Sequence, residues 1–169
     1  MNIEPNERTA MAQAVTTQPD GPGLRIGKRG ELVMIGNVAP GGAALFRQRL
    51  PQFQAEAAYW EDRVGTVHDF RILLFDNDTR YLLLLTYDGD FKPYLTDIAT
   101  QAREWLDAIA VDVLENYPGL TNPQVGDWVR GQMHQAEFFY VSNPDVTVRD
   151  IAKMKRLSQA FSDMLDSAA

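Results

Sequence analysis

Cysteine is absent from this chain of 169 residues, and histidine occurs only twice. Without cysteine the chain has no disulfide, no thiolate nucleophile and no cysteine-ligated metal. Neither histidine stands in a spacing typical of a metal site, and no glycine-rich phosphate loop with a following lysine occurs. The local motifs therefore predict no metal site.

Positive charge is also scarce, because 16 lysines and arginines face 23 aspartates and glutamates, for a net charge of −7. Nucleic acids and anionic membranes bind basic surfaces, so we expect neither as a partner. No apolar run approaches the roughly 18 residues of a membrane span. The N-terminus also lacks the charged-then-apolar layout of a signal peptide. These absences predict a cytoplasmic protein.

The N-terminal residues, 1–23, are polar and small, contain three prolines and show no periodic apolar face. This composition predicts a disordered or loosely docked arm. The remaining residues, 24–169, are enough for one domain with its own core.

The clearest structural signal is a pair of apolar runs, 67–75 and 81–89, on either side of the turn formers of 76–80. This pattern predicts a β-hairpin. From Ile72 to Phe75 and from Tyr81 to Leu85 no residue is charged, so period two makes both faces of these strands apolar. Both faces of the sheet must therefore be covered.

The other elements follow from apolar spacing and from prolines and glycines. We expect strands over 31–38 and 135–141, and helices over 43–62, 91–114 and 148–165. Pro51 predicts a kink or a new short helix, Asp90 is a candidate N-cap, and Pro118 with Gly119 ends the second helix. The order β-α-β-β-α-β with an extra C-terminal helix predicts a ferredoxin-like α+β fold with an antiparallel four-stranded sheet.

In that fold both main helices pack on one face of the sheet, and the other face is bare. A large apolar face is seldom exposed in a monomer. The simplest cover is a second copy, which predicts a homodimer with a barrel between the subunits, a dimeric α+β barrel. The C-terminal helix could instead fold back over part of its own sheet.

Two polar residues of the first hairpin strand are candidates for chemistry. By alternation His68 shares a face with the apolar residues of that strand, where it could act as a base or as a ligand of haem or a metal. The alternative is a histidine that is hydrogen-bonded at a strand end. Arg71 is a charge in an apolar strand and needs either an ion pair with Asp69 or a ligand carboxylate.

The segment that ends the hairpin offers further candidates. A tight turn explains Gly89 and a helix cap explains Asp90. Tyr87 and Asp88 remain, near the mouth of the predicted barrel, with Tyr94 one helical turn further on. A tyrosine–carboxylate pair could position a polar ligand, although turn formation alone also accounts for these residues.

The pattern His68-x-x-Arg71 followed by Tyr87-Asp88-Gly89 and a helix resembles a poorly characterised bacterial family of ferredoxin-like domains. That family belongs to the dimeric α+β barrel group, which includes small monooxygenases, chlorite dismutases and dye-decolourising peroxidases. The chain has Asp69-Phe70 where the family tends to have Phe-Ala, and it lacks the Gly-x-x-Asp-Gly motif of the haem peroxidases. The resemblance implies that the residues shared with the family line a pocket.

These observations together predict a homodimer that binds a small, largely apolar ligand in a cavity over the sheet. The candidate ligand contacts are His68, Arg71, Tyr87, Asp88 and Tyr94. Two alternatives remain open. One is an oxidoreductase, either cofactor-free and monooxygenase-like or dependent on haem. The other is a structural or regulatory dimerisation module.

Overall fold

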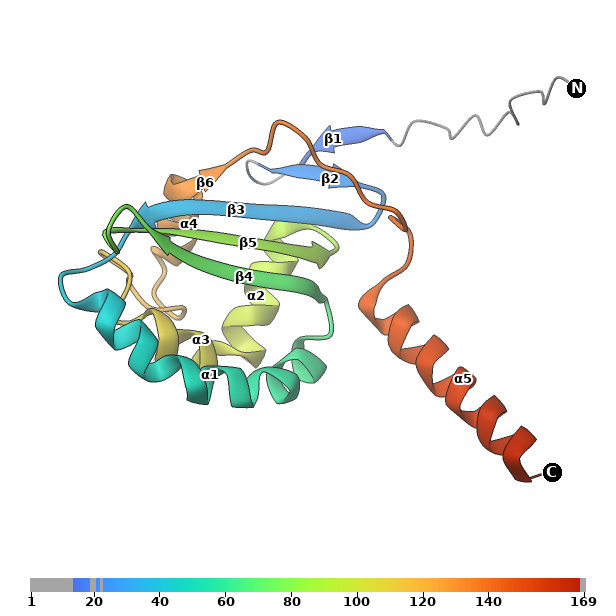
Figure 1. Ribbon diagram of the computed structural model, residues 1–169. Helices are drawn as coiled ribbons and strands as arrows, with labels where there is room; N and C mark the ends of the chain where they lie inside the picture. Colours follow the sequence, from blue (N-terminus) through green and yellow to red (C-terminus); the bar gives the residue numbers. More distant parts are fainter. Residues whose placement is uncertain (1–13, 19–20, 22, 168–169) are drawn as a thin grey trace, which may run out of the picture.

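The computed structural model describes residues 14–18, 21 and 23–167 and shows an α+β fold (Figure 1). The helices among these residues are α1 (Gly42–Val64), α2 (Phe91–Gln101), α3 (Arg103–Ala110), α4 (Val125–Gln132) and α5 (Val148–Ser167). The strands among them are β1 (Val15–Thr17), β2 (Leu24–Ile26), β3 (Arg29–Asn37), β4 (Val67–Phe75), β5 (Arg80–Asp88) and β6 (Met133–His134). The architecture is compatible with the predicted ferredoxin-like fold.

The strands form one antiparallel sheet in the order β1-β2-β3-β5-β4, and β6 also pairs with β3. The predicted hairpin is confirmed as β4 and β5. Its turn contains Asp76, Asn77 and Asp78 with φ of 51°, 54° and 67°. Asn and Asp tolerate this left-handed conformation better than other residues with a side chain, which is why the polar cluster 76–80 was a reliable signal.

Two details of the predicted helices are different in the structure. The chain stays in a single helix, α1, through Pro51, which is exposed. Water can therefore bind the carbonyl that the proline leaves without a donor. The predicted helix over 91–114 is divided at Ala102, which is buried and has a φ of −128°. The break redirects the chain so that α3 packs beside α1.

Asp90 occupies the N-cap position of α2, but its carboxylate makes no hydrogen bond to the helix. The carboxylate forms an ion pair with Arg25 instead. A cationic partner on the neighbouring β2 therefore replaces the cap that the sequence predicted.

The prediction of a fourth strand over 135–141 is wrong. Only Met133 and His134 pair with β3, opposite Met34 and Val33. Further along, β2 occupies the same edge of β3 at Arg29 and Gly30, which leaves only Glu31 and Leu32 between β2 and β6. Residues 135–147 therefore run across the sheet as an irregular segment, which we call the strap.

The predicted N-terminal arm is partly docked. Within it, residues 15–17 form β1 beside β2, and the side chain of Gln18 is buried. Its amide donates to the hydroxyl of Tyr87 over 2.7 Å and to the backbone oxygen of Glu31 over 3.1 Å. Most of the arm, residues 1–13, lies outside the described residues.

Helices α1 to α3 lie on one side of the sheet (Figure 1), and the side chains between them form the core. This helix face holds alternate residues of the central strands, such as Leu32, Met34, Leu83 and Leu85. The other face, which we call the open face, holds Val33, Leu82 and Leu84, each half-buried. Both faces are therefore apolar, as predicted, but the helices pack over the helix face only.

Helix α5 leaves the body of the molecule and projects away from it (Figure 1). None of its described residues is buried. It therefore does not fold back over its own sheet, which was one of the two arrangements that the sequence left open. Among the described helices, none has both the length and the apolar character of a membrane span.

Candidate functional site

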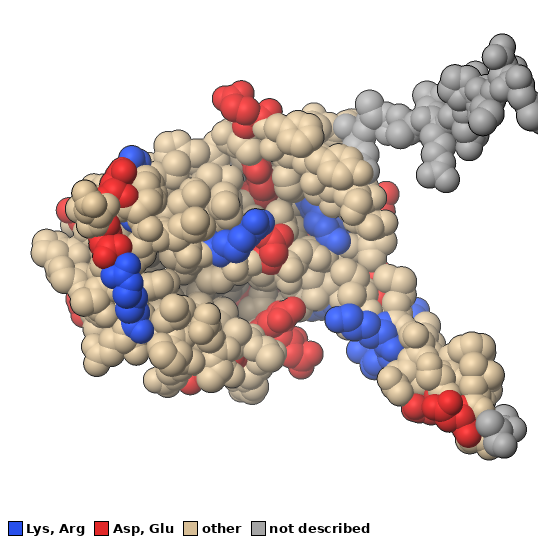
Figure 2. Space-filling model, viewed as in Figure 1, with Lys and Arg blue, Asp and Glu red and all other residues tan. Residues whose placement is uncertain are grey.

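A cavity of about 800 Å³ lies between the helix face of the sheet and helices α1 to α3. We call it the apolar cleft. The surface is hollowed between β4 and α1 in Figure 2. Most of the lining consists of aliphatic and aromatic side chains, among them Phe46, Phe53, Trp60, Ile72, Ile98 and Trp105.

The wall opposite the sheet is held together by an aromatic pair. The rings of Phe53 on α1 and Trp105 on α3 are stacked, with centroids 4.0 Å apart and planes at 4°. The indole N–H of Trp105 donates to the backbone oxygen of Phe53 over 2.9 Å. These two contacts fix α1 to α3 and so set the width of the cleft.

Polar residues are few in the lining. Three of them, His68, Asp69 and Arg71, are on the edge strand β4, where Asp69 and Arg71 pair with Thr86 and Leu84 of the open face. Arg71 donates to Asp69 over 2.7 Å, so the predicted ion pair is present. The two side chains are 63% and 39% exposed, which shows that the pair is not buried. An exposed pair stabilises a fold by at most about 1 kcal/mol. Arg71 is therefore more available to a ligand than a buried charge would be.

Strict alternation predicted that His68 shares a face with the apolar residues of β4. This prediction is wrong. Val67 pairs with Tyr87 and Asp69 pairs with Thr86, so His68 is the extra residue of a β-bulge. A bulge shifts the alternation by one residue and redirects a side chain. The imidazole Nε2 lies 2.9 Å from a carboxylate oxygen of Asp88.

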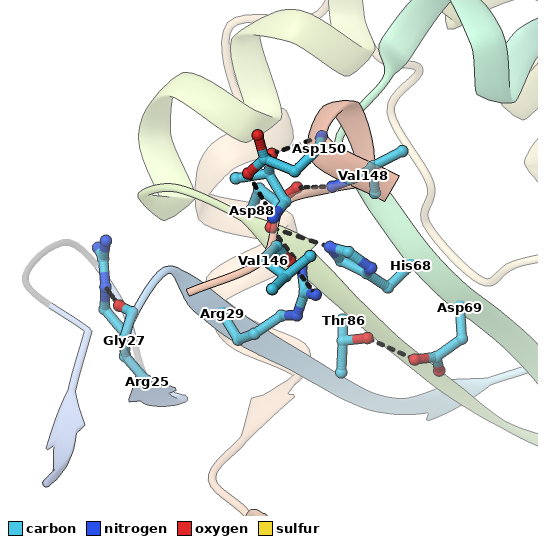
Figure 3. A network of polar contacts seen from close by, with 11 residues as sticks. Arg25, Gly27, Arg29, His68, Asp69, Thr86, Asp88, Val146, Val148 and Asp150 are labelled. Atoms are coloured by element: carbon cyan, nitrogen blue, oxygen red, sulfur yellow. Dashed lines mark hydrogen bonds and ion pairs between the residues drawn. The ribbon is translucent and has the colours of Figure 1, made fainter. Parts of the chain in front are cut away.

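Asp88 is the centre of a polar network that joins three strands to the start of α5 (Figure 3). Its carboxylate accepts hydrogen bonds from Arg29 of β3, from His68 of β4 and, over 2.7 Å, from the backbone N–H of Val148. Arg29 also donates to the backbone oxygen of Val146 in the strap. We call these groups the Asp88 network.

The charges of the network are buried, since the side chains of Arg29 and Asp88 are only 7% and 9% exposed. Both oxygens of Asp88 are bound by protein groups. The prediction that Asp88 contacts a ligand stays untested, but its visible role is to attach the strap and α5 to the sheet.

Burial lowers the pKa of His68 from its ordinary value of 6.5, and the charge of Arg29 acts in the same direction. The carboxylates of Asp88 and Asp69 oppose this shift but do not cancel it. The imidazole is therefore neutral at pH 7 and donates its Nε2–H to Asp88. A neutral donor of this kind completes the network without adding a second buried cation.

Because the unfolded chain takes up a proton at His68 near pH 6.5 and the folded chain only at lower pH, His68 should destabilise the fold as the pH falls below 6.5. We expect His68→Gln, which keeps an N–H donor but does not titrate, to weaken this fall. Urea unfolding at about pH 7.5 and about pH 5.5 gives the loss of unfolding free energy between these pH values, which is then compared between the variant and the native chain. His134→Gln removes an exposed imidazole and is the matched control. An equal pH dependence in the native chain and in His68→Gln would contradict the assignment.

The two candidate tyrosines belong to the core. The rings of Tyr87 and Tyr94 are stacked, with centroids 4.1 Å apart, and both side chains are buried. Burial raises the pKa of Tyr87 to about 12, although its bond to Gln18 acts in the opposite direction. Burial also raises the pKa of Tyr94. Tyr94 reaches the lining of the apolar cleft, whereas Tyr87 is not among the residues that line it.

A second, smaller cavity of about 540 Å³ lies on the open face, beneath the strap. It brings together four charged side chains of the sheet, the imidazole of His68 and residues 138–142 of the strap; the charged residues are Arg29, Glu31, Asp69 and Arg71. This is the position over the sheet where the sequence predicted a ligand, but it is smaller and more polar than the apolar cleft.

Sequence reasoning missed Arg29 and Glu31, which are both buried. The carboxylate of Glu31 accepts from the backbone N–H of Leu24 over 2.9 Å and from that of Ala136 over 3.1 Å. The two residues flank Gly30 at the start of β3. Two charged residues of opposite sign at alternate positions of a strand were the available signal for buried polar contacts on one face. Among the described residues, no group of three histidine or carboxylate side chains is arranged to hold a metal ion.

Comparisons of this chain with models of protein families, with curated proteins and with solved structures give no match. The resemblance carried by His68, Arg71, Tyr87 and Asp88 therefore stays a prediction. The candidate site rests on the geometry described above.

Proposed function

We propose that this protein binds a small, largely apolar molecule in the apolar cleft. The observation that carries the proposal is the cavity itself, about 800 Å³ lined mainly by aliphatic and aromatic side chains. Protein interiors are close-packed, with few voids larger than a water molecule. Filled with water at about 30 Å³ per molecule, the cleft would hold roughly 25 waters against apolar walls. Replacing that water with an apolar ligand is favourable.

The size and the lining indicate the class of ligand. Pockets of about 300–1,000 Å³ accommodate drug-sized molecules, with a few polar groups that fix their orientation. The polar groups of the cleft are Gln54 and Glu61 on α1 and, at the β4 edge, Arg71, whose register partner Leu84 lies on the open face. We infer a ligand with an apolar body inside the cleft and a polar or anionic head at the β4 edge, where Arg71 borders both cavities.

The proposal includes the ferredoxin-like topology. It is supported by the chain order β3-α1-β4-β5, then α2 to α4, then β6, and by the neighbours β6-β3-β5-β4 in the sheet. The homodimer is also part of the proposal, because the apolar open face of the sheet is only partly covered.

The oxidoreductase alternative requires a protein group that acts on the ligand. His68 is the candidate, since it lines the cleft, but its Nε2 is engaged by Asp88. The proposal is therefore binding, with no chemical step. Absorbance of the purified protein near 400 nm would report bound haem and would revive the alternative.

The test uses the fluorescent anion 1-anilinonaphthalene-8-sulfonate, which has an apolar body and a sulfonate head. We expect saturable binding with one site per chain and energy transfer from Trp60 and Trp105, which line the cleft. Ala57→Trp places an indole in the cleft and should weaken binding about tenfold, which corresponds to 1.4 kcal/mol.

Ala58→Trp is the matched control, because Ala58 is the next residue of α1 and is exposed. It should bind the probe as the native chain does. Circular dichroism of both variants verifies that the fold is intact. If a folded Ala57→Trp binds the probe as tightly as the control, the ligand is not in the cleft and the proposal is wrong.

A further inference from the structure

We propose that α5 of one copy packs on the open face of the sheet of a second copy, and that the exchange is reciprocal. This inference rests on the homodimer of the proposed function and names the element that builds it. It accounts for two apolar surfaces of the same chain that have no partner among the described residues.

The start of α5 is fixed to the body of the molecule. The N–H of Thr147 donates to the carboxylate of Asp150 over 3.0 Å, and the N–H of Asp150 donates to the Thr147 hydroxyl over 3.1 Å. This reciprocal pair is a capping box. The next N–H, of Val148, is bound by the Asp88 network. The helix is therefore started and aimed by the sheet of its own chain.

Beyond that start, α5 presents one apolar side to solvent. The side chains recur at three- and four-residue spacing and form what we call the α5 stripe: Ile151, Met154, Leu157, Phe161, Met164 and Leu165. Five of the six, from Met154 onward, are more than half exposed. Helices in proteins gain most of their stability from packing an apolar side. The α5 stripe therefore requires a surface.

The open face provides an apolar surface of the right kind. Two rows of residues cross β3, β5 and β4 in register: one row contains Val33 and Leu84, and the other contains Ile35, Leu82 and Leu73. We call these five residues the sheet patch. Leu73 is 48% exposed, and the other four are half-buried. The strap covers the opposite end of this face, and its Phe138 and Tyr140 are exposed beside the second cavity.

The chain's own α5 points away from this face, so a second copy is the occupant that carries a matching stripe (Figure 1). A two-fold axis makes each copy both donor and acceptor, which closes the assembly. The apolar cleft is no alternative site, because a 20-residue helix about 30 Å long and 10 Å wide fills roughly 2,400 Å³. The cleft offers only about 800 Å³.

The size of the interface also favours α5 on the sheet over α5 on α5. A stable interface takes about 20–30 residues from each partner. The α5 stripe alone offers six apolar side chains, whereas the sheet patch with Phe138 and Tyr140 adds seven more to each copy. Each copy then contributes thirteen apolar side chains to the two contacts, more than twice what α5 on α5 offers.

The distribution of charge also favours a second copy of the chain as the partner of the open face. The first half of α5 concentrates four cations, Arg149, Lys153, Lys155 and Arg156, and Figure 2 shows blue side chains gathered there. The whole chain has a net charge of −7. A basic helix end is attracted to the acidic body of another copy, which offsets part of the repulsion between two copies.

The absence of cysteine allows a direct test by disulfide cross-linking. The single variants Phe161→Cys and Leu84→Cys are mixed in equal amounts and oxidised. We expect a covalent dimer that contains one chain of each kind. Thr96→Cys, an exposed position on α2 on the other side of the sheet, replaces Leu84→Cys as the control and should give no such product with Phe161→Cys.

Sedimentation provides the second measurement. The native chain should have twice the mass of one chain, and Phe161→Asp should halve it, whereas Gln159→Glu on the polar side of α5 should leave the dimer intact. A monomeric native chain, or cross-linking of Phe161→Cys only with itself, would overturn the inference. So would a native chain that stays monomeric and sediments with anionic phospholipid vesicles.

The two proposals fail separately. The apolar cleft is contained in one chain, so monomeric Phe161→Asp should still bind 1-anilinonaphthalene-8-sulfonate. If the probe binds but no mixed dimer forms, the exchange of α5 is wrong and the cleft proposal stands. If the mixed dimer forms but Ala57→Trp binds the probe as the native chain does, only the cleft proposal is wrong.

Discussion

Replacing Asp88 with alanine is expected to lower the free energy of unfolding by about 3–5 kcal/mol. The change removes the partner of Arg29, whose side chain is buried, and leaves an uncompensated charge in the interior. It also removes the acceptor of the His68 N–H and of the Val148 backbone N–H. Urea unfolding measures the loss, and amide exchange should show faster opening in the first turn of α5.

Asp90→Ala is the matched control, because Asp90 also pairs with an arginine and lies two residues further along the chain. The side chains of Arg25 and Asp90 are 25% and 46% exposed, so water screens this pair. We expect a loss below about 1 kcal/mol. Equal losses from Asp88→Ala and Asp90→Ala would show that burial of the Asp88 network contributes nothing to the fold.

A double variant separates the pair from its surroundings. Arg29→Met combined with Asp88→Ala removes both charges, and we expect it to recover part of the stability that Asp88→Ala loses. The remaining loss then belongs to His68 and Val148, which still lack their acceptor.

The elements that were predicted correctly depend on local signals. The β4–β5 hairpin needs only two apolar runs and a cluster of Asp and Asn that accepts positive φ. The start of α5 is marked by Thr147 and Asp150, which form its capping box without help from distant residues. All the residues that determine such an element lie within a few positions of one another in the sequence, so the element can be predicted locally.

The strand predicted over 135–141 failed for a reason that lies elsewhere in the chain. Phe138, Phe139, Tyr140 and Val141 favour strands by composition. The edge that they would join is taken in part by β2, more than one hundred positions earlier in the sequence. Competition for a sheet edge has no local signature, so composition alone could not reveal it.

The arrangement of the candidate site could not be read from the sequence. His68 and Arg71 lie beside cavities, and their contact with a ligand stays a prediction. The bulge at His68 was hidden, because a single extra residue changes the face without changing the sequence pattern. The Asp88 network joins residues 20 to 60 positions apart, so only the folded chain shows that Asp88 contacts Arg29, His68 and Val148.

Phe53→Ala is expected to lower the free energy of unfolding by about 3–5 kcal/mol, the range for loss of a buried aromatic side chain. Phe53 is buried on α1 and stacks on Trp105 of α3. Its removal leaves α1 with fewer contacts across the apolar cleft and widens the cavity next to Trp105. We therefore also expect weaker binding of 1-anilinonaphthalene-8-sulfonate, measured as a higher Kd.

Tyr59→Ala is the control for Phe53→Ala, because it removes an aromatic ring from the same helix at an exposed position. Its ring contacts Trp60 and Arg63 at the surface and does not line the cleft. Both changes replace an aromatic residue of α1 with alanine, so any gain in helix propensity is shared. We expect a loss below about 1 kcal/mol for Tyr59→Ala and an unchanged Kd.

If both variants lose the same stability, the Phe53–Trp105 stack does not hold the cleft together. If Phe53→Ala is destabilised but binds the probe with the native Kd, the stack supports the fold and the ligand lies elsewhere.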